Sequence, residues 1–385
     1  MMRSRSSLLL VALSLVLSLS AGHSLGAPEP IKIGLQAPIT GPWAYEGEMA
    51  RNCVQIVADE INSAGGIAIG AVKRPVEIVL GDDQGSPRQS ALVAQRMLSD
   101  KVVAVIGTYG SSITDPASTI YERAGLVNIA YGSTAEKLTE QGRKFFFRTC
   151  FRDDRQGAFF AAFVNDTLKA KRVAILHDNT TFGKGLAEAA RRPLLEAKKA
   201  DLVFYDAVTP GERDFTAILS RMQKSNPEVV YYTGYYAEAG LIIRQMRNLG
   251  IKATFVGGNA AINDEFIKIA GLDVARGALM TQEPLPTDLK YPESKSFLDE
   301  YIRRHKEPPS SPWPVYAADA LKVIAAAISA TGSTDSKVLA DYLHNDLKDL
   351  PGITGPISFD AVGDREGAIY LAYEVTADGK FVPLQ

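Results

Sequence analysis

The sequence is poor in the side chains that most often bind metal ions. It contains two cysteines and four histidines in 385 residues, and no two histidines stand at the short spacing of a zinc site. We therefore expect no metal site. Cys53 falls on the apolar stripe of an expected helix, and Cys150 ends the strand-like run "KFFFRTC". One disulfide and two separately buried thiols both remain open.

A charge excess of either sign is also missing. The formal net charge is −2 at pH 7, and no polybasic cluster is present, which argues against a face for nucleic acid or anionic lipid. The start "MMRSRSS" leads into "LLLVALSLVLSLSAG", an apolar run too short and too early for a convincing membrane span. We therefore predict that residues 1–27 are a secretory signal peptide and that the mature chain works outside the cytosol.

Strand-like and helix-like segments, in contrast, alternate along the whole chain. "IKIGLQAPI" alternates like a strand and precedes a helical stripe that stops at Gly65 and Gly66. "PVEIVLGDD", "VVAVIGTYG" and "LVNIAYGST" continue the pattern, and "RVAILHDN", "EVVYYTGYY" and "ATFVGGNAA" repeat it later. This alternation predicts an α/β fold of parallel sheets with helices on both faces.

Two of the expected strand-to-helix turns are rich in small and hydroxyl-bearing residues. "GTYGSSITDP" contains Ser111 and Ser112, and "AYGSTAEKL" contains Gly132, Ser133 and Thr134. In an open parallel sheet, ligands bind at the carboxyl ends of strands, where a helix N-terminus offers unpaired N–H groups to an anion. The two turns together favour a site for one small carboxylate, although either turn alone could do no more than cap its helix. Neither turn matches a phosphate-binding motif.

The order and spacing of several motifs resemble one protein family. "ADEINSAGGI", "VIGTYGSS", "DPASTIYERAGLVNI", "FRTCFRDDRQG", "VAILHDNTTFGKGLA" and "ITGPISFDAVGD" are similar to motifs of the periplasmic leucine/isoleucine/valine-binding proteins of bacterial ABC importers. The resemblance implies the type I periplasmic binding fold, in which two doubly wound parallel-sheet lobes are joined by a three-crossover hinge. It implies an N-terminal lobe of residues 28–152 plus 282–360 and a C-terminal lobe of residues 153–281 plus 361–385.

The same resemblance implies a periplasmic receptor that binds a branched-chain or other hydrophobic amino acid between its lobes. Such a receptor delivers its ligand to an ABC permease at the inner membrane, and we expect a monomer without a cofactor. Ser111 and Thr134 match hydroxyl ligands of the carboxylate, and Gly132 matches a carbonyl that accepts from the ammonium. The other implied site residues are Trp43, Tyr109, Phe182, Tyr235, Glu238 and Asn259. For Trp43 and Glu238, local packing and helix capping remain open alternatives.

The sequence departs from the family pattern in three places; the first two leave the ligand itself open, and the third bears on stability. Asn259 stands where amino-acid binders of this family usually carry an acid, so either Glu238 meets the ammonium or the ligand has none. Glu46 stands where branched-chain binders tend to carry a tyrosine, and extra aromatic residues lie near the expected cleft. Gly85 and Gly110 replace a disulfide of the enteric members. The alternative ligand is an aromatic carboxylate, such as a benzoate, a phenylpropanoid or an aromatic keto acid.

An enzyme, namely a hydrolase, is the alternative function from a different class of protein. Ser111 would be its nucleophile, but "GTYGSS" lacks the G-x-S-x-G pattern. His177 is the histidine nearest to the expected cleft, and it stands outside the turns that match the family site. We therefore expect no catalytic residue and no enzymatic activity.

Overall fold

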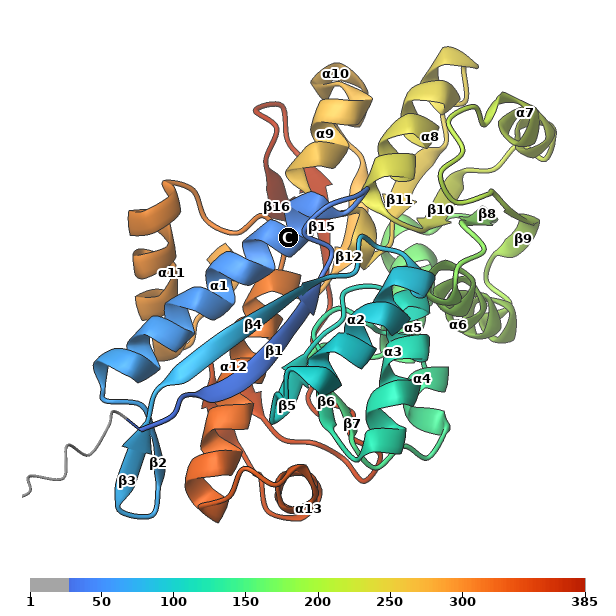
Figure 1. The fold of residues 1–385 in the computed structure, drawn as a ribbon. Coiled ribbons are helices and arrows are strands. Elements are labelled where there is room, and N and C mark those ends of the chain that lie inside the picture. Colours follow the sequence, from blue (N-terminus) through green and yellow to red (C-terminus); the bar gives the residue numbers. More distant parts are fainter. Residues whose placement is uncertain (1–27, 385) are drawn as a thin grey trace, which may run out of the picture.

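The computed structural model describes residues 28–384, which form two lobes built around separate sheets (Figure 1). The signal peptide predicted for residues 1–27 lies outside the described residues. The sheet of the first lobe is parallel throughout. Its spatial order is β4 (Val76–Asp82), β1 (Ile31–Ala37), β5 (Ala104–Ile106), β6 (Val127–Ala130) and β7 (Phe146–Arg148).

The sheet of the second lobe is parallel except at one edge. Its spatial order is β16 (Phe381–Pro383), β15 (Leu371–Val375), β12 (Leu279–Gln282), β11 (Thr254–Gly257), β10 (Val229–Thr233), β8 (Arg172–His177) and β9 (Asp201–Ala207). β15 runs antiparallel to both β12 and β16. The remaining strands form two small hairpins: β2 (Ile67–Ile69) with β3 (Val72–Arg74), and β13 (Leu350–Gly352) with β14 (Gly355–Ile357).

Helices cover both faces of the first sheet. They are α1 (Ala44–Ser63), α2 (Pro87–Ser99), α3 (Ser111–Ala124), α4 (Lys137–Glu140), α11 (Pro292–His305), α12 (Trp313–Thr331) and α13 (Ser336–Asn345). Successive residues of a strand point to opposite faces. Ala104 and Ile106 of β5 accordingly join the core under α1 and α12, whereas Val105 joins the core under α2 and α3. The predicted α/β fold with helices on both faces is confirmed.

The second lobe carries its own helices. They are α5 (Asp153–Ala162), η1 (Phe163–Leu168), α6 (Thr181–Ala197), α7 (Thr216–Lys224), α8 (Tyr236–Asn248), η2 (Asn259–Ala261), α9 (Asp264–Ala270) and α10 (Leu272–Ala275). α5 packs against α6, and α8 packs against α9. A further turn, η3 (Pro286–Asp288), follows β12.

The chain crosses between the lobes three times. It leaves the first sheet after β7, returns after β12 towards α11 and α12, and crosses again between β14 and β15. The crossing segments lie together, because the Tyr370 hydroxyl donates to the Arg152 carbonyl oxygen at 3.3 Å and Arg365 donates to the Thr149 carbonyl oxygen at 3.0 Å. These contacts tie the first and the last crossing segments together.

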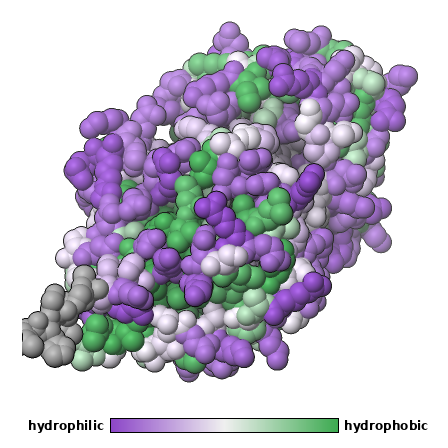
Figure 2. Space-filling view, in the orientation of Figure 1, coloured by the Kyte–Doolittle hydropathy of each residue, from purple (hydrophilic) through white to green (hydrophobic). Residues whose placement is uncertain are grey.

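The longest apolar helix of the described residues belongs to the core. α12 is long and apolar enough by composition to span a membrane, yet 67% of its apolar window is buried inside the protein. It packs against α1 in the first lobe. Figure 2 shows polar side chains over most of one face, with apolar ones gathered over the first lobe.

The two cysteines do not form a bridge. Cys53 on α1 and Cys150 after β7 are both buried and both free. Burial raises the pKa of the Cys150 thiol to about 12, so this thiol stays protonated and behaves as a small apolar side chain. The alternative of two separate thiols is therefore the one that the structure adopts.

Candidate functional site

Aromatic rings from both lobes meet between the two sheets. Trp43 precedes α1 and Tyr109 follows β5 in the first lobe, whereas Phe182 on α6 and Tyr235 before α8 belong to the second. The Trp43 and Tyr235 rings stack with centroids 4.1 Å apart. The Tyr109 centroid lies 5.9 Å from that of Tyr235, and the Phe182 centroid lies 5.3 Å from it. Four predicted site residues thus form one cluster, since parallel strands of each sheet end at the same edge.

Trp43 occupies the space that two glycines leave free. A β-carbon at Gly85 or at Gly110 would lie 2.9 Å from the Trp43 indole, closer than a carbon contact allows. Gly85 also has φ of +63°, which favours glycine. The positions without a disulfide therefore form the seat of an aromatic ring that reaches across to the other lobe.

Hydroxyl groups line the first lobe beside these rings. Ser111 is the first residue of α3, and its hydroxyl accepts a hydrogen bond from the Ala135 amide at 3.2 Å. Thr134 is buried, and its hydroxyl has no hydrogen-bond partner among residues 28–384. No side chain caps α3, so the first N–H groups of this helix remain available. A β-carbon at Gly132 would lie 2.7 Å from the Tyr109 ring, which fixes a residue without a side chain there.

Two buried carboxyl groups lie at the hinge side of the cluster. Asp153 begins α5, and its amide donates to the Thr134 carbonyl oxygen at 3.0 Å. Glu283 follows β12, and one of its oxygens accepts from the Asn259 amide group at 3.4 Å. Both residues are fully buried, and both Asp153 oxygens and Glu283 Oε1 accept no hydrogen bond from a described residue. Burial raises the pKa of Asp153 to about 7 and that of Glu283 to about 8.

Glu238 is not brought to this cluster. It lies on the first turn of α8 and is half-buried, and its Oε1 accepts from the Gly211 amide at 3.0 Å. It lines a separate surface cavity together with Pro42 and Arg213. The expectation that Glu238 reaches the ligand is therefore corrected, because its helix turns this side chain towards the loop before α7.

Sequence reasoning missed Asp153 and Glu283 as site residues. Both stand close to points where the chain was expected to change lobes, in "FRDDRQG" and "MTQEP". Acidic residues in such segments are usually exposed, so burial could not be read from the pattern. The crossing points themselves were the available signal, because ligands of two-lobed folds bind beside the hinge.

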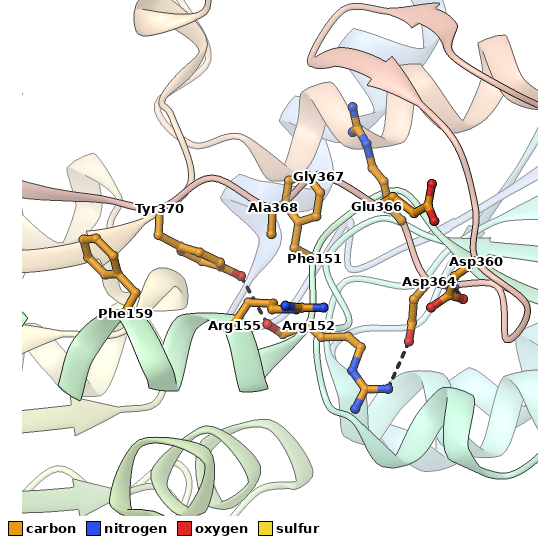
Figure 3. Close-up of a pocket in the computed structure, with 11 residues that line it drawn as sticks. Phe151, Arg152, Arg155, Phe159, Asp360, Asp364, Glu366, Gly367, Ala368 and Tyr370 are labelled. Atoms are coloured by element: carbon orange, nitrogen blue, oxygen red, sulfur yellow. Dashed lines mark hydrogen bonds and ion pairs between the residues drawn. The ribbon is translucent and has the colours of Figure 1, made fainter. Parts of the chain in front are cut away.

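A cavity of about 600 Å³ lies on the outer side of the hinge (Figure 3). Arg152 and Phe159 line it from the α5 side, and Asp364 and Tyr370 line it from the last crossing segment. Its central charges are already paired, since Arg152 contacts Asp364 at 3.0 Å. The cavity shares no lining residue with the ring and hydroxyl cluster and is therefore separate from it.

No histidine of the described residues takes part in the cluster around Ser111. His177 ends β8, its Nδ1 accepts from the Asn179 amide at 3.0 Å, and its ring packs 5.4 Å from that of Tyr205. Within residues 28–384, no three His, Cys, Asp or Glu side chains are arranged to hold a metal ion. The arrangement offers hydrogen bonds, charge and apolar walls to a ligand.

A model of the family described as "Periplasmic binding protein" matches residues 30–380. The chain belongs to this family. The description of this family as binding proteins agrees with the chemistry of the cluster, whose groups suit a small ligand. The resemblance stated from the sequence motifs is thereby confirmed.

Relatives of known description extend this result. An amino acid binding protein of Pseudomonas aeruginosa is 35% identical over 379 residues, which are 98% of this chain and 97% of the relative. A leucine-, isoleucine-, valine-, threonine- and alanine-binding protein of the same species is 34% identical, over 92% of each chain.

Solved structures show the same architecture. The leucine-binding protein LivK of Thermotoga maritima has 30% identity and a TM-score of 0.84, over 92% of this chain and 98% of that one. The branched-chain amino acid transporter substrate-binding protein LivJ of Streptococcus pneumoniae, solved with isoleucine, has 30% identity and a TM-score of 0.81, over 92% and 100%. These comparisons support the type I periplasmic binding fold.

Proposed function

We propose that this protein is the solute receptor of an ABC importer and binds a branched-chain or other hydrophobic amino acid between its lobes. The observation that carries the proposal is the chemistry of the cluster. Hydroxyl and N–H groups suit a carboxylate, buried carboxyl groups suit an ammonium, and rings from both lobes suit an apolar side chain. The relatives named above support the same ligand class.

In this proposal, Ser111, Thr134 and the start of α3 bind the carboxylate of the ligand. The Gly132 carbonyl oxygen and the buried acids receive the ammonium, and Trp43, Tyr109, Phe182 and Tyr235 pack on the side chain. Asn259 acts through its amide. Charge-assisted hydrogen bonds of this kind are worth about 1.5–3 kcal/mol each, so two or three of them fix the orientation of a small zwitterion.

Lobe closure would complete the site. Two hydrogen bonds already join the lobes at the rim: the Tyr236 hydroxyl donates to the Pro42 carbonyl oxygen at 2.9 Å, and Asn263 donates to Glu46 at 2.5 Å. A ligand held first by the first lobe would recruit Phe182 and Tyr235 and shift the population towards this closed form. The two moving bodies would be residues 28–152 plus 282–360 and residues 153–281 plus 361–385, and a permease would recognise the closed pair.

We place the receptor in the periplasm, exported by the leader at residues 1–27, as a monomer without enzymatic activity. An aromatic carboxylate is the second candidate ligand, favoured by the number of rings and by the amide of Asn259. Two buried acids oppose a ligand that carries only negative charge, because an anion would repel them in a region of low dielectric constant. The zwitterion is therefore preferred.

A thermal-shift screen of the mature protein tests the function. The screen compares the standard amino acids, their keto acids and a set of benzoates and phenylpropanoids, because a ligand that binds the folded state raises its melting temperature. We expect the largest shifts with leucine, isoleucine or valine. A shift confined to aromatic acids would replace the ligand class, and consumption of a ligand would contradict the receptor role.

A further inference from the structure

Glu283 is held at the end of β12 by a chain of backbone and amide contacts. β11 and β12 are parallel neighbours, so the residues after them lie at the same edge of the sheet. Gln282 donates to the Asn259 carbonyl oxygen at 2.8 Å, and its own amide oxygen accepts from the Glu283 amide at 2.9 Å. This bracing fixes where the Glu283 carboxyl group stands.

The carboxyl group lacks a positive partner. The pKa of Glu283 is set mainly by burial and by three neighbours. None of these neighbours carries positive charge: they are Asn259, Asp153 and Tyr370. The Arg148 guanidinium acts to lower the pKa of Asp153, but it is already paired with Asp364 and also donates to the carbonyl oxygens of Ser133 and Ala135. A buried acid that faces another acid without a cation is unfavourable unless it stays protonated or a ligand supplies the charge.

Asp153 reaches the same region from the other side of the hinge. Its oxygens accept no hydrogen bond from a described residue, although Thr134 lies beside them. Burial and the charges of both acids raise the pKa values of the Tyr231 and Tyr370 hydroxyl groups. Both acids stand at crossings between the lobes. The helix that Asp153 begins packs on the strand that Glu283 follows, since Gln156 of α5 donates to the Thr281 carbonyl oxygen of β12 at 2.8 Å.

We propose that Glu283, with Asp153 opposite it, receives the ammonium of the ligand and thereby selects amino acids over the corresponding acids without an amino group. This inference rests on the proposed function and names the specificity-determining residue of that site. Asn259 and Gln282 are positioning residues that hold Glu283 in place. The negative charge that meets the ammonium thus comes from Glu283 after β12, while Asn259 after β11 supplies an amide group.

The test is titration calorimetry at pH 7 of the mature protein and its Glu283→Gln variant, with leucine and with its keto acid, 4-methyl-2-oxopentanoate. The amide keeps the shape of the side chain and removes its charge. We expect leucine to bind about 100-fold more weakly to the variant, because a charge-assisted bond is lost. The keto acid should bind within about threefold or more tightly, since it has no ammonium to lose. Glu238→Gln is the matched control and should leave both affinities unchanged.

A second variant tests the charge and not merely the fold. Asn259→Asp in the Glu283→Gln background moves the carboxyl group to the neighbouring strand end. We expect this double variant to bind leucine at least about tenfold more tightly than Glu283→Gln alone. Equal leucine binding by wild type and Glu283→Gln would overturn this inference and leave the receptor role intact. Equal loss of leucine and keto acid would also overturn it, because that result indicates a general distortion. Failure of the wild type to bind any amino acid would remove the proposed function, and this inference with it.

Discussion

The two walls of the cleft are built from different chemistry. The first lobe presents Ser111, Thr134 and the uncapped start of α3, which are neutral donors. The second lobe presents the rings of Phe182 and Tyr235, and the acids Asp153 and Glu283 lie at the crossings between the lobes. A carboxylate therefore finds its partners on the first lobe, and an ammonium finds its charge at the hinge. The difference indicates an order of binding, with the first lobe engaged before closure.

Removing the hydroxyl groups of Ser111 and Thr134 from the first lobe should have the largest effect on ligand affinity. We expect Ser111→Ala combined with Thr134→Ala to weaken amino-acid binding by about 10²- to 10⁴-fold, because each hydrogen bond to a charged group contributes about 1.5–3 kcal/mol. Titration calorimetry measures the loss. Ser112→Ala in the same turn is the control and should bind normally; near-normal binding by the double variant would refute the assigned roles.

A methyl group placed where the walls meet should have the next largest effect. In Gly110→Ala the new β-carbon would lie 2.9 Å from the Trp43 ring and from the Tyr235 hydroxyl, and such overpacking costs about 1–3 kcal/mol. We expect affinity to fall by about 5- to 150-fold. Gly185→Ala also faces the other lobe, but its β-carbon would lie 3.6 Å from Asp153, an ordinary contact. If both variants lost affinity equally, close packing of Trp43 would not be the cause.

Buried acids of both lobes and of the hinge should make the stability of the protein depend on pH. The pKa values of the buried acids are raised by burial to about 7 for Glu46, Asp83, Asp153 and Asp178 and about 8 for Glu283. The folded chain then binds more protons than the unfolded chain, so stability falls as pH rises through 7 to 8. Urea unfolding without ligand should give a free energy about 1.4 kcal/mol or more higher at pH 6.5 than at pH 8.5, the equivalent of one pKa unit.

Bound ligand should make the stability of the protein depend less on pH. Saturating leucine should reduce the difference between the two pH values, because its ammonium pairs with ionised Asp153 and Glu283. A ligand-free protein that is more stable at pH 8.5 would show that these acids are ionised without penalty. The contrast between the neutral donors around Ser111 and the buried acids at the hinge would then lose its physical basis.

The smallest expected effect on affinity comes from a hydrogen bond at the rim that joins the lobes without contacting the ligand. Tyr236→Phe removes the hydroxyl that donates to Pro42 across the lobes, and a neutral hydrogen bond is worth about 0.5–1.5 kcal/mol. Affinity should fall by about 2- to 10-fold while the melting temperature changes little. Tyr205→Phe removes a hydroxyl that bonds Glu188 within the second lobe and should leave affinity unchanged. Equal effects of the two variants would argue against a role of Tyr236 in closure.

Local patterns predicted much of this molecule. Alternating strand and helix segments led to the α/β fold, and the turns at Ser111 and Thr134 led to the hydroxyl side of the cleft. Trp43 was harder, because local packing and contact across the cleft look alike in sequence. Glu238 was misplaced for a related reason: an acid on the first turn of a helix can face a ligand or a neighbouring loop, and only the packing of α8 decides which.

Periodicity, turn chemistry and motif order belong to the sequence by itself, and they determined the two-lobed architecture and the kind of groups that end each strand. Which groups become buried together depended on the hinge. Asp153 and Glu283 are 130 positions apart in the sequence. Each stands at a crossing between the lobes, Asp153 after β7 and Glu283 after β12. Their ionisation depends on water being excluded by both lobes at once, a property of the closed tertiary structure that no local pattern contains.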